Sequence, residues 1–183
     1  RWGNTAEQII KSNPYVLCIQ GVDLSFSRAD AVAAKSDIPA DSECRIKAGI
    51  TYILRQNADQ GHTCLPLDSL VKTAVSYLDV DEKLIKKVIE DETEEENLYY
   101  YDKHGRRFVM LADFYKAEDY IARRLAIMRQ ISYDNKIDFS EVIDLEEENN
   151  GIQYEKIQRE AINLALSKGF LVLTGGPGTG KTT

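Results

Sequence analysis

The sequence predicts a mainly α-helical chain with one β-hairpin, followed by the start of an α/β fold. Three observations predict it: apolar residues at helical spacing over most of residues 1–131, two β-rich runs around a Gly-containing turn, and a Gly-rich loop after an apolar run near the C-terminal end. We divide the chain into a helical domain (1–60), a winged-helix-like domain (61–131), a linker (132–152) and the truncated start of a third domain (153–183).

The helical domain is expected to contain three main helices. The first begins after Thr5, whose hydroxyl is a capping group, and ends before Pro14. A short helix over 27–35, capped by Ser27, precedes a longer helix from about Ser42 to Gln56. The regular apolar spacing of the longer helix predicts one buried face.

A tight turn at Gly21 separates predicted helices and gives the domain a helix-hairpin-helix outline. Such hairpins bind DNA phosphates through backbone amides and read no bases. Asp23 stands where a second glycine is normal, and its carboxylate would repel a phosphate. We therefore expect the fold without the phosphate contact.

The next seventy residues have the element order of a winged helix. After an extended segment at 61–66 we expect a helix over 67–78, a helix capped by Asp81, strands at 98–101 and 107–111 joined by a turn at 102–105, and a helix from 112 to about 131. Two helices, a hairpin and a helix are typical of that fold.

The hairpin carries the candidate DNA contacts of this domain. Lys103, Arg106 and Arg107 place positive charge at its tip, and the tyrosines at 99–101 offer stacking faces. The alternative is that the tyrosines alternate between core and solvent while the charges keep a strand edge soluble. We favour the alternative, because the neighbouring sequence is acidic and winged helices often contact proteins.

Residues 132–152 lack sustained periodicity and have the composition of a linker, with a short strand expected at 142–145. The acidic clusters at 90–96 and 146–148 are expected to be solvated loop faces. The net charge of −7 argues against a simple electrostatic nucleic-acid binder, but these clusters contribute nine carboxylates, and without them the chain is close to balanced.

Composition also bears on the compartment. The three cysteines, Cys18, Cys44 and Cys64, are odd in number and form no C-x-x-C pair, which is typical of a reduced, cytoplasmic protein. No apolar stretch has the length of a membrane span. His62 and Cys64 lack a second pair at ligand spacing, so we expect no metal there.

The C-terminal residues fit the phosphate-binding loop G-x-x-x-x-G-K-[ST] at every fixed position, after an apolar run at 170–174 that is expected to be a strand. Lys181 supplies a charge for the β- and γ-phosphates of ATP, and the Thr182 hydroxyl is a ligand for Mg²⁺. The candidate nucleotide-binding residues of the loop are Gly175, Gly176, Pro177, Gly178, Thr179, Gly180, Lys181, Thr182 and Thr183. The chain on its own, without a downstream acidic residue, is expected not to hydrolyse ATP.

An amphipathic helix is predicted over 154–166, with Ile157, Ala161, Leu164 and Ala165 on its apolar face. Gln158 lies on this helix, ahead of the loop, and its amide can both donate to and accept from an adenine edge. We interpret it as the adenine-reading glutamine of superfamily 1 and 2 helicases. The alternative is a solvated glutamine.

In this order, the motifs resemble the RecD-type DNA helicases, the exodeoxyribonuclease V alpha-subunit family in its long form with an N-terminal extension. The resemblance covers most of the chain, and its most specific parts are Gly-His-Thr-x-Leu-Pro at 61–66 and the loop at 174–183; Asn13-Pro14-Tyr15, Gly21-Val22, the segment 111–122 and Gln158 accompany them. It implies a superfamily 1 helicase that moves 5′ to 3′ on single-stranded DNA, uses ATP and Mg²⁺, and acts in recombination or repair. Its partners would be single strands and duplex junctions, with a protein partner possible through the N-terminal region.

A different class of protein remains an alternative. A P-loop ATPase that remodels proteins would share the loop, and its front end would then be a protein-interaction module. Stimulation of the ATPase by DNA separates the two classes.

Overall fold

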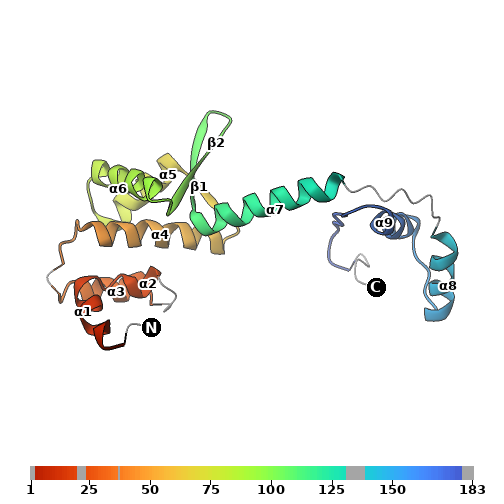
Figure 1. Ribbon diagram of the computed structural model, residues 1–183, viewed down its shortest axis with the longest axis horizontal. Helices are drawn as coiled ribbons and strands as arrows, with labels where there is room; N and C mark the ends of the chain where they lie inside the picture. The colour runs from red at the N-terminus through yellow and green to blue at the C-terminus, as the bar shows by residue number, and fades with distance from the viewer. Residues whose placement is uncertain (1–2, 20–23, 37, 131–138, 179–183) are drawn as a thin grey trace. The chain divides into compact units, whose positions relative to one another are not determined.

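Figure 1 shows the computed structural model of the 183-residue chain, which describes residues 3–19, 24–36, 38–130 and 139–178. The chain forms two compact units, Arg1–Ala117 and Glu118–Thr183. The structure is mainly helical with a small three-stranded sheet in the described residues, which agrees with the mainly helical part of the predicted class. The predicted start of an α/β domain stays a prediction. The domain limits at residues 60, 131 and 152 stay predictions.

The first unit begins with a 3₁₀ turn (Gly3–Thr5) and the helices α1 (Ala6–Ser12), α2 (Val16–Ile19), α3 (Phe26–Ala33) and α4 (Glu43–Asp59). The predicted limits of α1 are confirmed, although the Thr5 side chain makes no cap hydrogen bond. Ser25, in extended conformation, is the N-cap of α3, so the predicted cap at Ser27 is wrong and Ser27 lies inside the first turn. Gly21 and Asp23 lie outside the described residues.

The rest of the first unit follows the predicted winged-helix order. It comprises β1 (Cys64–Pro66), α5 (Leu67–Leu78), α6 (Glu82–Glu94), β2 (Leu98–Lys103), β3 (Arg106–Leu111) and the first turns of α7 (Ala112–Gln130). Asp81 caps α6 as expected, because its carboxylate accepts a hydrogen bond from the Lys83 N–H at 2.8 Å.

The sheet is antiparallel, with β3 between β1 and β2. The strands of the hairpin are longer than predicted, because the turn needs only His104 and Gly105, both at positive φ (50° and 73°). Two successive residues at positive φ are the mark of a two-residue hairpin turn whose twist matches that of the strands.

Helix α4 is the centre of the first unit. It packs against α2 and α3, and also against α5, α6, β1 and β3, and in Figure 1 it lies between these two groups of elements. Ile46 and Ile50 are buried on α4, and at Gly49 a Cβ atom would lie 2.6 Å from Cδ2 of Leu78. The missing side chain at Gly49 therefore lets α5 approach α4 closely.

A polar network joins the two sides of α4. The guanidinium of Arg45 donates to both carboxylate oxygens of Asp30 on α3, at 2.8 and 3.1 Å, and the Tyr15 hydroxyl donates to the same carboxylate at 2.5 Å. Nη1 of Arg45 also donates to the carbonyls of Ala40 (2.7 Å) and Leu78 (2.9 Å). Because Leu78 is the last residue of α5, Arg45 satisfies a terminal helix carbonyl that has no partner within its own helix.

Aromatic rings form a second link across the same boundary. Phe26 on α3 stacks with Tyr15 at 5.6 Å and with Tyr52 at 5.9 Å between ring centroids, and Tyr77 on α5 lies 5.5 Å from Phe26 and 5.7 Å from Tyr52. Phe26 and Tyr15 are buried. The N-terminal helices therefore share both ionic and aromatic contacts with the α4–α5 layer.

The acidic cluster at 90–96 is more than a solvated face. Glu92 is 8% exposed on α6, and its carboxylate lies 2.8 Å from Nζ of Lys47 on α4. Burial lowers the pKa of Lys47, but hydrogen bonds to Glu43 and Glu92 outweigh this effect and hold the pKa above its usual value. The interpretation as a solvated loop is thus wrong for Glu92, which helps to join α6 to α4.

The second unit contains the later turns of α7, then α8 (Ser140–Asn150) and α9 (Lys156–Ser167). The strand expected at 142–145 is wrong, since these residues lie in α8, where only Ile143 is buried. The apolar run expected as a strand at 170–174 has no regular secondary structure. A strand needs a hydrogen-bonded neighbour, and the sheet of the described residues belongs to the first unit.

Two chemical expectations can be compared with the described residues. Within the described residues, Cys18, Cys44 and Cys64 form no disulfide bond. In the part of the chain that the structure describes, no helix combines the length and the apolar character of a membrane span.

We predict that Asp30→Asn lowers the free energy of unfolding by about 1–2 kcal/mol at pH 7, since charged hydrogen bonds of this kind are worth about that much and Asp30 is partly exposed. Hydrogen bonding to Arg45 holds the pKa of Asp30 below its usual value, despite the opposing effect of burial. Its contribution is therefore complete above the unfolded-state pKa of about 3.9 and is lost as pH falls through the lower folded-state pKa.

Urea unfolding at several pH values tests this. The difference between wild type and variant should shrink below about pH 4. Asp41→Asn, at an exposed position before α4, is the control and should change stability by less than about 0.5 kcal/mol. A difference for Asp30→Asn that stays constant down to pH 2 would contradict the account.

Candidate functional site

The candidate nucleotide site begins at the N-terminus of α9. Gln158 and Glu155 form a capping box: the Glu155 N–H donates to Oε1 of Gln158 at 2.8 Å, and the Glu155 side chain accepts from the Gln158 backbone N–H. The box explains why α9 begins where it does. The alternative of a merely solvated glutamine is therefore incomplete, because Gln158 has a defined structural role.

Helix α9 is held to α8 by charge. Arg159 donates to Glu147 at 2.6 Å and to Asp144, and the other oxygen of Glu147 accepts from the Tyr154 N–H at 2.7 Å. Glu147 is mostly buried, with its side chain 15% exposed, so the solvated-loop interpretation of the cluster at 146–148 is wrong for this residue. These bonds fix the position of Tyr154 relative to α9.

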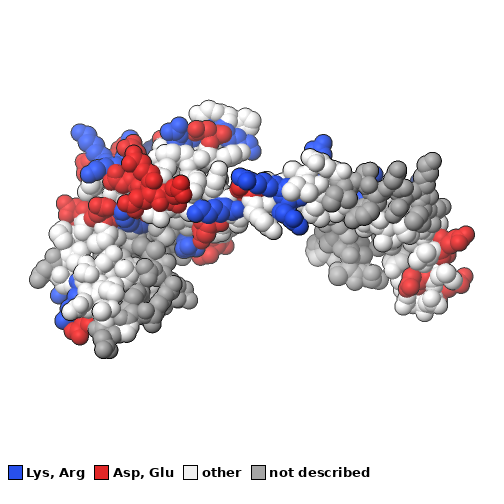
Figure 2. Space-filling view, in the orientation of Figure 1, with Lys and Arg blue, Asp and Glu red and all other residues white. Residues whose placement is uncertain are grey.

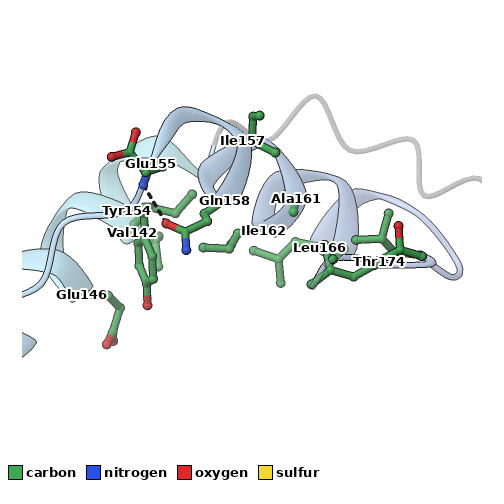
Figure 3. A pocket seen from close by; sticks show the side chains of 15 residues that line it. Val142, Glu146, Tyr154, Glu155, Ile157, Gln158, Ala161, Ile162, Leu166 and Thr174 are labelled. Atoms are coloured by element: carbon green, nitrogen blue, oxygen red, sulfur yellow. Dashed lines mark hydrogen bonds between the residues drawn. The ribbon is translucent and has the colours of Figure 1, made fainter. Parts of the chain in front are cut away.

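An open apolar pocket of about 780 Å³ lies along one side of α9. Figure 3 shows Tyr154 and Gln158 near one end, and Leu166 with Thr174 near the other. Gln158 and Leu166 are separated by eight residues of helix, or about 12 Å along the axis. The pocket is long enough to take a ligand with two chemically different ends and has the size of a small-molecule site.

The apolar face predicted for α9 is largely exposed in the structure. Ile157 is 77% exposed and Leu164 is 44% exposed, and no residue of α9 is fully buried. Leu173 and Val172, in the segment before the loop, are 51% and 72% exposed. The second unit thus presents apolar side chains on both α9 and the segment that follows it.

The structure describes only the first residues of the predicted phosphate-binding loop. Thr174 and Gly175 line the pocket, and Gly178 has a φ of +77°, a conformation that favours glycine. Gly176 and Pro177 lie between them. Thr179, Gly180, Lys181, Thr182 and Thr183 lie outside the described residues, so their assignment to ATP and Mg²⁺ stays a prediction.

The candidate DNA contacts of the hairpin differ from one another. Lys103 and Arg106 are exposed and face each other across the strands at the turn. Arg107 instead donates to both oxygens of Asp102, at 3.0 and 3.2 Å, and its guanidinium carbon lies 4.9 Å from the centre of the Tyr100 ring. The structure therefore brings Lys103 and Arg106 together, whereas Arg107 is paired with Asp102.

Sequence reasoning missed the contacts that use these tyrosines. Tyr99 stacks on Tyr115 of α7, with ring centroids 4.1 Å apart and ring planes 5° apart, and Tyr101 lies 6.4 Å from Phe108. Strand alternation was a usable signal for the pairs within the hairpin. The partner on α7 was not predictable from local pattern.

No metal centre is evident within the described ranges, where no three His, Cys, Asp or Glu side chains are grouped to hold an ion. The predicted Mg²⁺ ligand Thr182 lies outside these ranges.

Residues 1–64 match the family model described as the ATP-dependent RecD2 DNA helicase HHH domain. The match covers 64 of the 183 residues, from the 3₁₀ turn through α4 to the first residue of β1. It supports a RecD2-type helicase N-terminal region and the predicted helix-hairpin-helix fold of this part of the chain.

Proposed function

We propose that the chain is the N-terminal part of an ATP-dependent superfamily 1 DNA helicase of the RecD2 type, which acts in DNA recombination or repair. One observation carries the proposal: a RecD2 helix-hairpin-helix match at residues 1–64 and a complete phosphate-binding loop sequence at 175–182 occur in the same chain. The match supports a class of DNA helicase, and the loop sequence supports ATP as the nucleotide that it hydrolyses.

The residues around the pocket fit a purine nucleotide. Gln158 offers amide donors as well as an acceptor. Its oxygen has two lone pairs, so the bond from the Glu155 N–H does not exclude a second one. Tyr154 adds an aromatic side chain at the same end of the pocket (Figure 3). At the other end the chain leads from Thr174 and Gly175 into the loop, where backbone N–H groups would receive phosphates.

Within the loop, Lys181 would neutralise charge on the β- and γ-phosphates, and Thr182 would be a ligand of Mg²⁺. When bound, the ion would neutralise charge that develops during phosphoryl transfer. The acidic groups that complete such a site belong to a downstream strand in P-loop ATPases, so hydrolysis is proposed for the full-length helicase.

The DNA substrate is proposed from the helix-hairpin-helix match and from the resemblance to RecD-type enzymes. The proposed substrate is single-stranded DNA next to a duplex junction, with movement 5′ to 3′. Helix-hairpin-helix elements contact the DNA backbone without reading sequence, which suits an enzyme that must move along any sequence. In this chain Asp23 would weaken that contact at the hairpin itself, so the match supports the class of substrate and not a particular phosphate contact.

We expect Lys181→Ala in the full-length protein to lower DNA-stimulated ATPase activity by at least about 100-fold, because it removes a charge that stabilises the transferring phosphoryl group. Lys168→Ala, at an exposed lysine ahead of the loop, is the matched control and should retain activity. The measurement is ATP turnover with and without single-stranded oligonucleotide. Turnover that does not respond to DNA would favour a P-loop ATPase of another class.

Gln158→Glu separates adenine recognition from helix capping. A glutamate at this position can still close the capping box, but it lacks the amide donors. We expect an approximately tenfold higher KM for ATP with little change in kcat, together with a smaller preference for ATP over GTP. Gln153→Glu, which makes the same change at an exposed residue before α9, should leave KM unchanged. An unchanged nucleotide preference in Gln158→Glu would remove the adenine role.

A further inference from the structure

The β2–β3 hairpin has two chemically different faces. Residues paired across an antiparallel ladder point to the same side, so the register sorts every side chain of the hairpin. One face carries Leu98 with Leu111, Tyr100 with Val109, and Asp102 with Arg107; the other carries Tyr99 with Met110, Tyr101 with Phe108, and Lys103 with Arg106. We call the second set the aromatic face.

The side chains of the first of these faces make their contacts within the protein. Leu98, Val109 and Leu111 belong to the core of the first unit. Farther out, Arg107 is paired with Asp102 and lies over Tyr100. The carboxylate of Asp102 is therefore neutralised on the face opposite to the aromatic one.

The aromatic face keeps accessible ring surface. Met110 at its base is buried (3% exposed), whereas Tyr101 is 45% exposed and Tyr99 and Phe108 are partly exposed. Tyr99 is held parallel to Tyr115 at 4.1 Å, so its ring is oriented before any ligand arrives. Rings that are fixed in this way lose little side-chain entropy when a further flat group stacks on them.

The charge on the aromatic face has one sign. Among the hairpin residues on this face, only Lys103 and Arg106 carry a formal charge, and both are exposed at the outer end. On the adjoining first turn of α7, Asp113 is paired with Arg55 at 2.9 Å. In contrast, the carboxylates of the first unit gather over α6 in Figure 2. The aromatic face thus complements an anionic ligand, despite the net charge of −7.

We infer that the aromatic face is a binding surface for single-stranded DNA, in which unpaired bases stack on Tyr101 and its neighbours Tyr99 and Phe108 while Lys103 and Arg106 hold phosphates. A row of ring faces next to two cations is the combination that single-strand binders use, because every base has a π-face and every nucleotide has a phosphate. Bases within a duplex are already stacked, so the rings select for a single strand. Arg107 plays no part in this binding.

This role rests on the proposed function, since a helicase is the class of enzyme that produces single strands. Its test is independent of ATP turnover. A chain that binds single strands through this face but shows no DNA-stimulated ATPase in the full-length protein would remove the helicase proposal and leave the surface intact.

The test uses the whole 183-residue chain and a fluorescent oligo(dT) at low salt, with binding followed by fluorescence anisotropy. Tyr101→Ala should weaken binding about tenfold, as expected for loss of base stacking on one ring, while Tyr101→Phe should bind like wild type. Tyr120→Ala is the matched control, because Tyr120 is a 64% exposed tyrosine on α7, outside the aromatic face. Circular dichroism of each variant checks that the fold is retained.

Two further comparisons make the assignment specific to this face. Lys103→Gln and Arg106→Gln should each weaken binding and lower the dependence of log K on log[salt] by about 0.7, whereas Arg107→Gln should leave both unchanged. An abasic oligomer of the same length should bind wild type and Tyr101→Ala equally, because it has phosphates and no bases.

Three results would overturn the inference: no oligo(dT) binding by the wild-type chain at low salt, equal binding by Tyr101→Ala and Tyr120→Ala, or a larger loss with Arg107→Gln than with Arg106→Gln. Any of these would leave the hairpin as an edge kept soluble by charge or as a surface for a protein partner.

Discussion

The ionic network around Arg45 is the contact on which the first unit depends. Arg45 lies on α4, its side chain is only 13% exposed, and its guanidinium binds Asp30 of α3, the carbonyl of Ala40 and the last carbonyl of α5. A buried guanidinium is stable only when its donors are satisfied, so the three acceptors must stay together. The network therefore fixes the N-terminal helices and the end of α5 against the same helix. The ring contacts of Phe26 with Tyr52 and Tyr77 reinforce this boundary with apolar surface.

This arrangement has a consequence for the RecD2 match. The matched segment ends at residue 64, but the compact unit continues to Ala117, and α4 supplies core residues to both parts. The helix-hairpin-helix region is thus built on the same framework as the hairpin with the aromatic face. The RecD2-matched helices and the proposed surface for unpaired bases would then belong to a single folded unit. A motor could use such a unit as a fixed guide for its substrate.

Local patterns predicted most elements because local physics decides them. The carboxylate of Asp81 caps α6, apolar spacing sets α5, and Gly105 permits the hairpin turn.

The elements and contacts that local pattern predicted wrongly have equally definite causes. Val142–Leu145 contains the β-branched residues Val142 and Ile143 but lies in a helix, because a strand without a neighbour cannot satisfy its backbone. Local pattern predicts Glu92 and Glu147 to be solvated, because the cations that hold them, Lys47 and Arg159, lie on other helices. The pairing of Arg107 with Asp102 is a different case, because the two residues lie opposite each other in the hairpin and its register could have predicted the pair, whereas Lys103 and Arg106 remain exposed.

Arg45 is expected to make the helices of the RecD2-matched segment unfold together with α5 and β3, as one cooperative unit. Native-state hydrogen exchange of wild type and Arg45→Met tests it most directly, because exchange reports the opening free energy of each segment. We predict similar opening free energies for α3, α5 and β3 in the wild type, and a fall in all three in the variant. Loss of protection confined to α3, with α5 and β3 unchanged, would contradict the claim and show that the N-terminal helices open on their own.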